Sequence, residues 1–287
     1  MKAKSDGIED QYKLLKRILK SMGNVLVAYS GGVDSTFLLQ VAKEALGDNV
    51  LAVTARSVTT SAADREDAVR LVRYLGVRHL WVDTFEMDLP AFVKNPKDKC
   101  YICKKSRFGE LVKLARAHGI ETVADGQNTD DLADYRPGMR ATEELGIRSP
   151  LCEAGFGKAD IRRFSKKLNL PTWDKPSAAC LASRIPYYQK ITAEKLKQVE
   201  DAELFLRKLN LSMQIRVRHE GHTARIELAA DAIPKIIEKD VRKRVIAHFN
   251  ALGFRFVALD LEGYSMGSLN RALSRPAKKS EAQKGRF

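Results

Sequence analysis

Residues 25–36, VLVAYSGGVDST, constrain the fold more than any other stretch of the chain. Residues 25–29 form a short apolar run, partly β-branched, which predicts a buried strand of a parallel sheet. Residues 30–36 follow, and apolar residues at helical spacing begin at once with Phe37 and Leu38. The stretch therefore predicts a strand, a glycine turn and a helix.

The glycine turn has the features of a phosphate site. Gly31 and Gly32 let the backbone turn tightly and approach an anion closely. The first N–H groups of the following helix, with its dipole, supply about half a positive charge. The loop is neither a Walker A sequence nor GxGxxG. A strand-to-helix turn with incidental glycines is the alternative.

The rest of the amino-terminal half repeats this alternation of strands and helices. Strands are predicted at residues 50–55, 78–82 and 122–124, and helices at residues 8–22, 60–75, 106–118 and 158–168. Such an order is typical of an α/β fold with a doubly wound parallel sheet, whose ligands lie at the carboxyl ends of the strands.

The pattern changes after the proline-containing residues 171–190, which have no clear period. The sequence then predicts a helix at 192–208, a hairpin of 214–219 with 223–228, a helix at 231–249 and a strand at 254–259. We expect an ATP-binding domain at 1–175, a smaller α+β domain at 176–270, and a disordered basic tail at 271–287.

The chain has 50 Lys and Arg against 36 Asp and Glu, a net charge of +14. This excess favours a polyanion or a phosphorylated small molecule as partner, or else a solvated basic surface. We expect a cytoplasmic protein without a membrane segment, because no signal peptide and no run of about 18 apolar residues is apparent. In a reducing compartment its four cysteines favour chemistry or metal binding over disulfides.

Several motifs resemble known families. The SGGVDS loop is similar to the pyrophosphatase loop of the adenine nucleotide α-hydrolase-like, or PP-loop, superfamily, which splits ATP between its α and β phosphates. Five further stretches resemble the LarE family of ATP-dependent sacrificial sulfur transferases, which help to make the nickel-pincer nucleotide cofactor of lactate racemase. They are CYICK (100–104), DGQNTDDLADYRPGMRA (125–141), GIRSPLCEAG (146–155), PTWDKPSAACLASRIPY (171–187) and DLEGY (260–264).

The resemblance implies a mechanism in which Cys180 is the catalytic nucleophile. ATP adenylates a carboxylate of a pyridinium biscarboxylate mononucleotide, and the thiolate displaces AMP. Elimination then leaves a thiocarboxylate on the substrate and dehydroalanine in the protein. Positive neighbours favour a thiolate, and Lys175 and Arg184 flank this cysteine in sequence. An inert core thiol is the alternative.

The resemblance also assigns an ATP site with Mg²⁺. Asp34 is expected to act catalytically as the partner of the metal ion. A plain helix N-cap is the alternative for the polar residues after the fourth strand. The residues expected to bind ATP are Ser30, Gly31, Gly32, Asp34, Ser35, Arg56, Ser57, Asp125, Gly126, Asn128 and Asp131.

The hairpin is expected to bind the anionic substrate. Side chains alternate along a strand, so Arg216 and Arg218 share the face opposite the apolar one, and Glu227 of the partner strand lies beside them. Arginines on one face can hold a phosphate or carboxylate, and family members bind their mononucleotide with arginines here. Arg184 joins this expected substrate set, while a solvated outer face is the alternative.

Cys100 and Cys103 form a C-x-x-C motif, expected on a loop before a helix. The spacing fits half a zinc site, a redox pair, part of an iron–sulfur cluster or a structural pair. Some LarE members carry a [4Fe–4S] cluster on three cysteines, which here would be Cys100, Cys103 and Cys180. The sequence leaves open whether sulfur comes from Cys180 or from a cluster.

Other functions stay open beside the leading hypothesis. They are an RNA thiolase, an amidating synthetase and a non-catalytic ATP sensor or sulfur-carrier scaffold. No RNA-binding module is apparent, which disfavours nucleic acid as a partner. The chain also departs from the family pattern at Ser265, where an arginine is typical. We expect a homo-oligomer that acts on a small anionic nucleotide and contacts other nickel-pincer biosynthesis proteins transiently.

Overall fold

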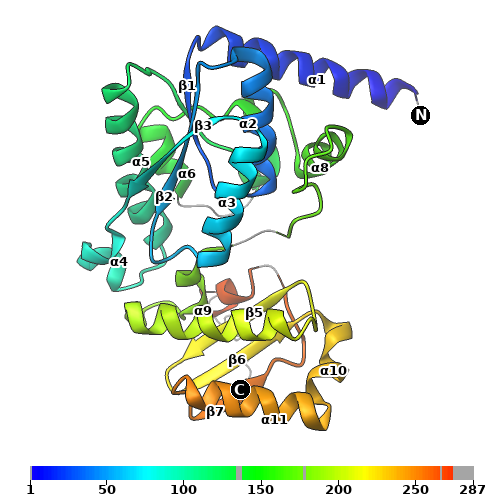
Figure 1. Cartoon of the computed structure of the whole chain (residues 1–287). Helices are drawn as coiled ribbons and strands as arrows, with labels where there is room; N and C mark the ends of the chain where they lie inside the picture. Colours follow the sequence, from blue (N-terminus) through cyan, green and yellow to red (C-terminus); the bar gives the residue numbers. More distant parts are fainter. Residues whose placement is uncertain (1, 134–137, 177–178, 266, 274–287) are drawn as a thin grey trace, which may run out of the picture. The chain divides into compact units, whose positions relative to one another are not determined.

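The structure, a computed structural model, describes residues 2–133, 138–176, 179–265 and 267–273 (Figure 1). The chain divides into two compact units, Met1–Ala182 with Tyr188–Glu200 and Ser183–Tyr187 with Asp201–Phe287. The domain limits expected from the sequence remain a prediction. The expected tail lies outside the described residues from position 274 on.

Unit 1 contains a parallel sheet with the strand order β3-β2-β1-β4. Its strands are β1 (Val25–Ala28), β2 (Val50–Arg56), β3 (Arg78–Asp83) and β4 (Val123–Ala124). In β1, Val25 and Val27 pack into the core beneath α2 and α3, whereas Leu26 packs into the core beneath α5 (Figure 1). Because both faces of β1 are buried, its sequence is a continuous apolar run. The predicted α/β class is confirmed.

The helices of unit 1 depart from the prediction in two places. The predicted helix at 106–118 begins seven residues earlier, at Lys99, so the expectation that Cys100 and Cys103 lie on a loop is wrong. Three short helices, α4, α6 and α7, lie where none was predicted. The helices are α1 (Lys2–Ser21), α2 (Val33–Leu46), α3 (Ala62–Tyr74), α4 (Pro90–Val93), α5 (Lys99–Ala117), α6 (Gly138–Glu144), α7 (Pro150–Glu153) and α8 (Lys158–Lys167).

Unit 2 is built on a three-stranded sheet with the order β5-β6-β7. The predicted hairpin is confirmed: β5 (Ile215–Glu220) and β6 (Thr223–Leu228) are antiparallel, and β7 (Phe256–Leu259) runs parallel to β6. Gly221 adopts φ +68° in the two-residue turn, a conformation that favours glycine. The helix α9 (Ala193–Lys208) runs from unit 1 into unit 2.

The predicted helix at 231–249 is two helices, α10 (Ile233–Ile237) and α11 (Lys239–Ala251). Glu238 interrupts them with an extended backbone, ψ 139°. Apolar residues of α9, β5, β6 and α11, among them Leu206, Ile215, Ile226 and Phe249, form the core of unit 2.

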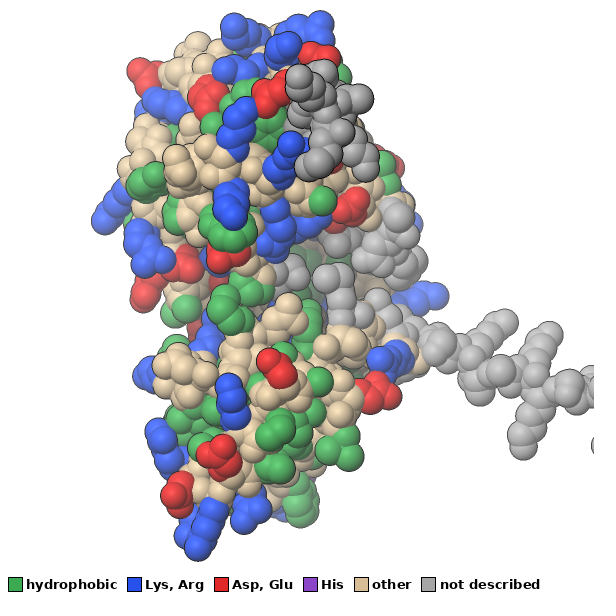
Figure 2. All heavy atoms as spheres, turned by 90° about the vertical axis from the view of Figure 1, so that its right-hand side faces the viewer, with side chains coloured by type: hydrophobic (Ala, Val, Ile, Leu, Met, Phe, Trp, Pro, Cys, Tyr) green, Lys and Arg blue, Asp and Glu red, His purple; other side chains and the backbone are tan. Residues whose placement is uncertain are grey.

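The described part of the chain contains no helix with both the length and the apolar character that a bilayer crossing needs. On the face drawn in Figure 2, Lys and Arg side chains are scattered, with Asp and Glu between them. Positive and negative side chains are thus mixed on this face.

Candidate functional site

A cavity of about 320 Å³ lies at the carboxyl ends of β1, β2 and β4 in unit 1. Parallel α/β sheets bind ligands at this end of their strands. The glycine loop, the start of α2, the end of β2, α5 and the segment after β4 all contribute side chains. The polar lining consists of Ser30, Asp34, Ser35, Thr54, Thr60, Asp64, Arg65, Lys104, Arg107, Asp125, Gln127 and Asp131, with Gly32 and Gly126.

The glycines of this cavity permit close backbone contacts. Gly31 has φ +70°, and a Cβ there would lie 3.0 Å from the Cα of Ala68 on α3. A Cβ on Gly126 would lie 2.9 Å from the backbone nitrogen of Ser35. Gly32 is the N-cap of α2, and no side chain of the described residues caps that helix, so its first N–H groups are available to an anion.

Two carboxylates of the cavity, the partly buried Asp34 and the buried Asp125, fit a divalent cation. Asp34 Oδ2 accepts a hydrogen bond from Lys158 Nζ at 2.5 Å, but its Oδ1 is buried and accepts none within the described residues. Burial raises the pKa of Asp34 although Lys158 opposes the shift, and burial also raises the pKa of Asp125. A nearby cation would offset the cost of burying these negative charges. Mg²⁺ fits this role, because it binds through one or two carboxylates and substrate phosphates.

Asn128 does not line the cavity. Its Oδ1 accepts the backbone N–H of Asp130 at 3.0 Å, and its own N–H donates to Asp131 Oδ2 at 3.2 Å. It stabilises the short 3₁₀ helix at Thr129–Ala133. This arrangement favours the capping alternative for Asn128.

Arg56 and Ser57 do not line this cavity either. Arg56 pairs with Asp83, its register partner on β3, at 2.7 Å, and its guanidinium lies 5.8 Å from the ring centroid of Trp81. Ser57 is buried and its hydroxyl lies 2.8 Å from that of Thr59. The cross-strand ion pair draws Arg56 toward β3.

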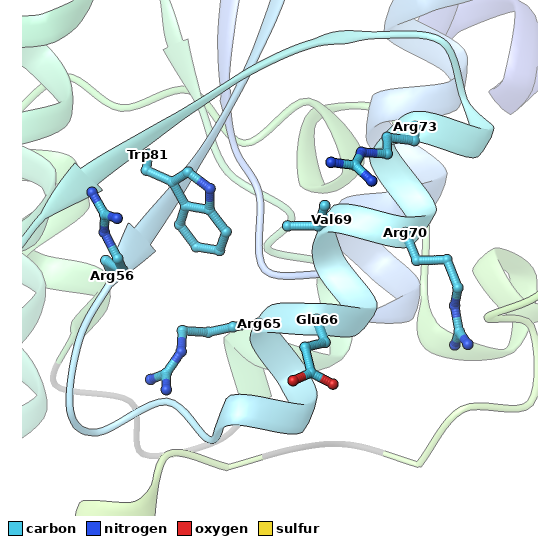
Figure 3. Close-up of a pocket in the computed structure, with 7 residues that line it drawn as sticks. All are labelled: Arg56, Arg65, Glu66, Val69, Arg70, Arg73 and Trp81. Carbon is cyan, nitrogen blue, oxygen red and sulfur yellow. The ribbon is translucent and has the colours of Figure 1, made fainter.

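Arg56 instead lines a second hollow of about 560 Å³ between α3 and β3 (Figure 3). The hollow also contains Trp81 and three arginines of α3, of which Arg65 borders the first cavity as well. Arg70 pairs with Asp67, and Arg65 donates to two backbone carbonyl oxygens. Most of the positive charge in the hollow is therefore already engaged.

Cys180 is exposed, and the residues after it are anchored to unit 1. The Leu181 N–H donates to the Thr59 carbonyl at 2.8 Å. The Ala182 carbonyl accepts from Nζ of Lys99, whose side chain is buried at the first residue of α5, at 3.2 Å. These contacts hold the segment of Cys180 beside the start of α5 and next to Thr60 of the cavity.

The same anchoring brings the C-x-x-C motif toward Cys180. Cys103 is within electrostatic range of both Cys100 and Cys180, and burial raises its pKa to about 12 although Arg107 opposes the shift. Its thiol donates to Glu86 at 3.6 Å. None of the four cysteines, all described, forms a disulfide. The exposed Cys180 suits a nucleophile better than the protonated Cys103.

The three cysteines are not arranged as a metal site. Among the residues that the structure describes, no group of three or more His, Cys, Asp or Glu side chains is placed to hold a metal ion. A cluster on Cys100, Cys103 and Cys180 would require another arrangement of these side chains.

Lys104 and Arg107 are site residues that the sequence analysis missed. Both project from α5 into the cavity, and Lys104 Nζ lies 3.8 Å from Asp125. Lys158 and Lys175 were also not expected beside the glycine loop. Lys158 donates to Asp34, and Lys175 donates to the Gly31 carbonyl at 3.2 Å. A helix predicted from residue 99 would have placed Lys104 and Arg107 on one face.

The hairpin residues of unit 2 are buried, so the solvated-face alternative is wrong. Arg218 donates to both carboxylate oxygens of Glu227, at 2.9 and 2.6 Å, and Arg184 pairs with Glu203 in the same way at 2.8 and 3.0 Å. Burial, with the charge of Arg184, lowers the pKa of Arg216. A cation in such surroundings is stabilised by an anionic ligand.

Comparison with known proteins identifies the family. The profile described as NAD synthase matches residues 8–104. The chain is 36% identical to the pyridinium-3,5-bisthiocarboxylic acid mononucleotide synthase of Lactiplantibacillus plantarum, over 90% of this chain and 92% of that protein. The chain belongs to the LarE family. The resemblance seen in the motifs of the sequence is thus confirmed.

Two further relatives match most of this LarE-family chain. The uncharacterized protein slr1717 of Synechocystis is 43% identical over 93% of this chain and 100% of its own length. The uncharacterized protein MJ0830 of Methanocaldococcus jannaschii is 32% identical over 87% of this chain and 98% of its own length.

Proposed function

We propose that this LarE-family chain is an ATP-dependent sulfur transferase that converts a carboxylate of a pyridinium-3,5-biscarboxylate mononucleotide into a thiocarboxylate. One observation carries the proposal. An exposed cysteine, Cys180, is anchored beside the first turn of α5, the helix that lines the cavity at the glycine loop. An activating site and a nucleophile thus belong to the same compact unit.

The first step is adenylation. A substrate carboxylate oxygen attacks the α-phosphorus of ATP and pyrophosphate leaves. The N–H groups at the start of α2, with Ser30 and Ser35, bind the pyrophosphate. Asp34, with its buried Oδ1, would hold Mg²⁺, and the ion would supply positive charge that neutralises the phosphates.

The second step transfers sulfur. The Cys180 thiolate attacks the acyl carbon, the bond from that carbon to the phosphate oxygen breaks, and AMP leaves with the electron pair. Removal of the Cα proton of Cys180 then breaks its Cβ–S bond. The products are a thiocarboxylate and a dehydroalanine at position 180.

The arginines of unit 2 are proposed to bind the substrate. Arg218 and Arg184 are fixed by buried carboxylates, and Arg216 lies 5.1 Å from the Tyr264 ring. These fixed donors suit a phosphate or carboxylate. The substrate itself is carried over from the relative's name. The homo-oligomer, the transient protein partners and the cytoplasmic location remain predictions.

The test is the intact mass of anaerobically purified protein before and after one incubation with ATP, Mg²⁺ and the pyridinium biscarboxylate mononucleotide. We expect AMP, pyrophosphate and a loss equal to the mass of hydrogen sulfide, mapped to Cys180 by peptide digestion. Cys180→Ala should form no thiolated product, whereas the matched Cys152→Ala should behave as the wild type.

Other outcomes separate the alternatives. Thiolated product with an unchanged Cys180 would favour sulfur delivery from a cluster on Cys100, Cys103 and Cys180. Absence of both product and AMP would contradict the substrate and favour an RNA thiolase. Tight ATP binding without pyrophosphate release would favour a sensor or sulfur-carrier scaffold.

A further inference from the structure

Arg107 lies between the ATP cavity and the cysteines. It lines the cavity from α5, three residues after Lys104, and it is within electrostatic range of both Cys103 and Cys180. Its side chain is only 26% exposed. The Arg107 guanidinium thus belongs to the cavity and also interacts electrostatically with the two thiols.

The donors of Arg107 are only partly used. Nη2 donates to Glu86 Oε1 at 2.6 Å, whereas Nε is buried and has no acceptor within the described residues. A guanidinium carries five N–H donors in a fixed plane. Leaving buried donors unsatisfied costs free energy, so this side chain is prepared for an oxyanion.

Glu86 fixes the orientation of that plane. Its side chain is 1% exposed, and it accepts hydrogen bonds from Thr84 Oγ1 at 3.0 Å and from the Cys103 thiol. Because the carboxylate is buried and held on two sides, Arg107 has little freedom to turn. Glu86 is thus a positioning residue.

We propose that Arg107 binds the α-phosphate of the acyl adenylate and stabilises AMP as it leaves. The inference rests on the proposed function. The β and γ phosphates belong at the glycine loop, so the α-phosphate and its acyl group are the parts of the ligand that must face the nucleophile.

A cationic donor at the α-phosphate favours the transfer of the acyl group from AMP to sulfur. As sulfur bonds to the acyl carbon, the bond from that carbon to the phosphate oxygen breaks and the electron pair moves onto that oxygen. Negative charge therefore grows on the α-phosphate. A preoriented guanidinium stabilises this charge more in the transition state than in the ground state.

The experiment compares Arg107→Met and Arg107→Lys with the wild type in single-turnover reactions of the full chain. Removing a preorganised donor of this kind typically lowers a rate about 10²–10³-fold. We expect that loss in AMP release from the adenylate, while the Kd for Mg·ATP changes less than about threefold. Millimolar guanidinium ion should restore part of the rate of Arg107→Met.

Two variants keep the test decisive. Arg116→Met, on the exposed end of the same helix, should match the wild type. Glu86→Gln combined with Arg107→Met avoids an unpaired buried carboxylate, and it should still bind Mg·ATP while AMP release stays slow. A wild-type rate in Arg107→Met would overturn the inference. Absence of AMP from the wild type itself would instead contradict the proposed function.

Discussion

Gly126 determines how closely the segment after β4 approaches the start of α2. A side chain there would meet the Ser35 nitrogen at 2.9 Å and the Ser35 Cα at 3.1 Å. Those are backbone atoms of the proposed phosphate site, and they cannot rotate away as a flexible side chain does. Small residues at this position thus maintain the geometry of the cavity.

We predict that Gly126→Ala weakens Mg·ATP binding at least tenfold, because the added Cβ displaces the first turn of α2. Isothermal titration calorimetry measures the change. Gly109→Ala is the matched control. Gly109 lies within α5, and no atom of another described element lies within 4 Å of a Cβ added there, so this variant should leave ATP binding intact and stabilise the helix by about 0.5–1 kcal/mol. Equal ATP affinity in both variants would contradict the close approach.

The ionised form of a buried carboxylate in the cavity lowers the folding stability of the chain. Burial raises the pKa of Asp125, partly opposed by Lys104, so the ionised form is disfavoured in the folded chain. The folded state is therefore most stable, relative to the unfolded state, below about pH 3.9, the pKa of an aspartate in an unfolded chain. This stability is lost as the pH rises through the higher pKa that Asp125 has in the folded chain.

We therefore predict that Asp125→Asn raises the Tm of the protein without ligand at pH 7, and that the gain disappears near pH 4. Ser149 Oγ, 2.8 Å from Asp125 Oδ1, can keep its hydrogen bond to the amide oxygen. Turnover of ATP should fall at least tenfold because a carboxylate of the cavity is lost. Differential scanning calorimetry at both pH values tests this, and a gain that persists at pH 4 would exclude the titration as its cause.

Among the helices and strands, the sequence predicted the elements whose pattern of apolar residues reflects which side chains are buried. The strands of the parallel sheet and the hairpin were found because their apolar residues face the cores. The start of α5 was missed since residues 99–105, KCYICKK, have no apolar period. Tertiary contacts stabilise this turn: Lys99 donates to Asn95 and Ala182, and the Tyr101 hydroxyl donates to Glu144.

The candidate site was predictable only where a local motif carries the chemistry. The glycine loop, Asp125 and Asp131 do line the cavity. Arg56 does not, because an ion pair with a neighbouring strand decides its direction. Arg107 was missed for a similar reason, since its role depends on the distant Glu86. Alternation placed Arg216 and Arg218 on one face, but it could not tell that this face is buried.

Glu203 connects α9 with the hairpin in unit 2. Its side chain is buried, pairs with Arg184, and accepts the Val217 N–H at 3.0 Å. We predict that Glu203→Ala lowers the free energy of unfolding of unit 2 by about 3–5 kcal/mol, because a buried guanidinium loses its partner. Urea denaturation measures this. Lys208→Ala, on the exposed last turn of α9 in unit 2, should cost less than about 1 kcal/mol. Equal costs would exclude a structural role for the pair.

The whole molecule consists of two units that each have a hydrophobic core. In unit 1 the cores lie on the two faces of the parallel sheet, and in unit 2 the core lies between the mixed sheet and its helices. The proposed ATP site belongs entirely to unit 1. A ligand stabilises only the folded structure to which it binds.

We predict that Mg·ATP and Glu203→Ala act on different units. Hydrogen exchange followed by mass spectrometry should show slower exchange with Mg·ATP in peptides of β1, α2 and β4, and unchanged exchange in β5 and β6. Glu203→Ala should speed exchange in peptides of unit 2, β5 and β6 among them, and leave exchange in β1, α2 and β4 unchanged. At 100 times the Kd of ATP the stabilisation of unit 1 is about 2.7 kcal/mol, which corresponds to roughly a hundredfold slower exchange where opening is global. Protection spread evenly over both units would mean instead that they unfold as one cooperative structure, because the binding energy would then be shared by both cores.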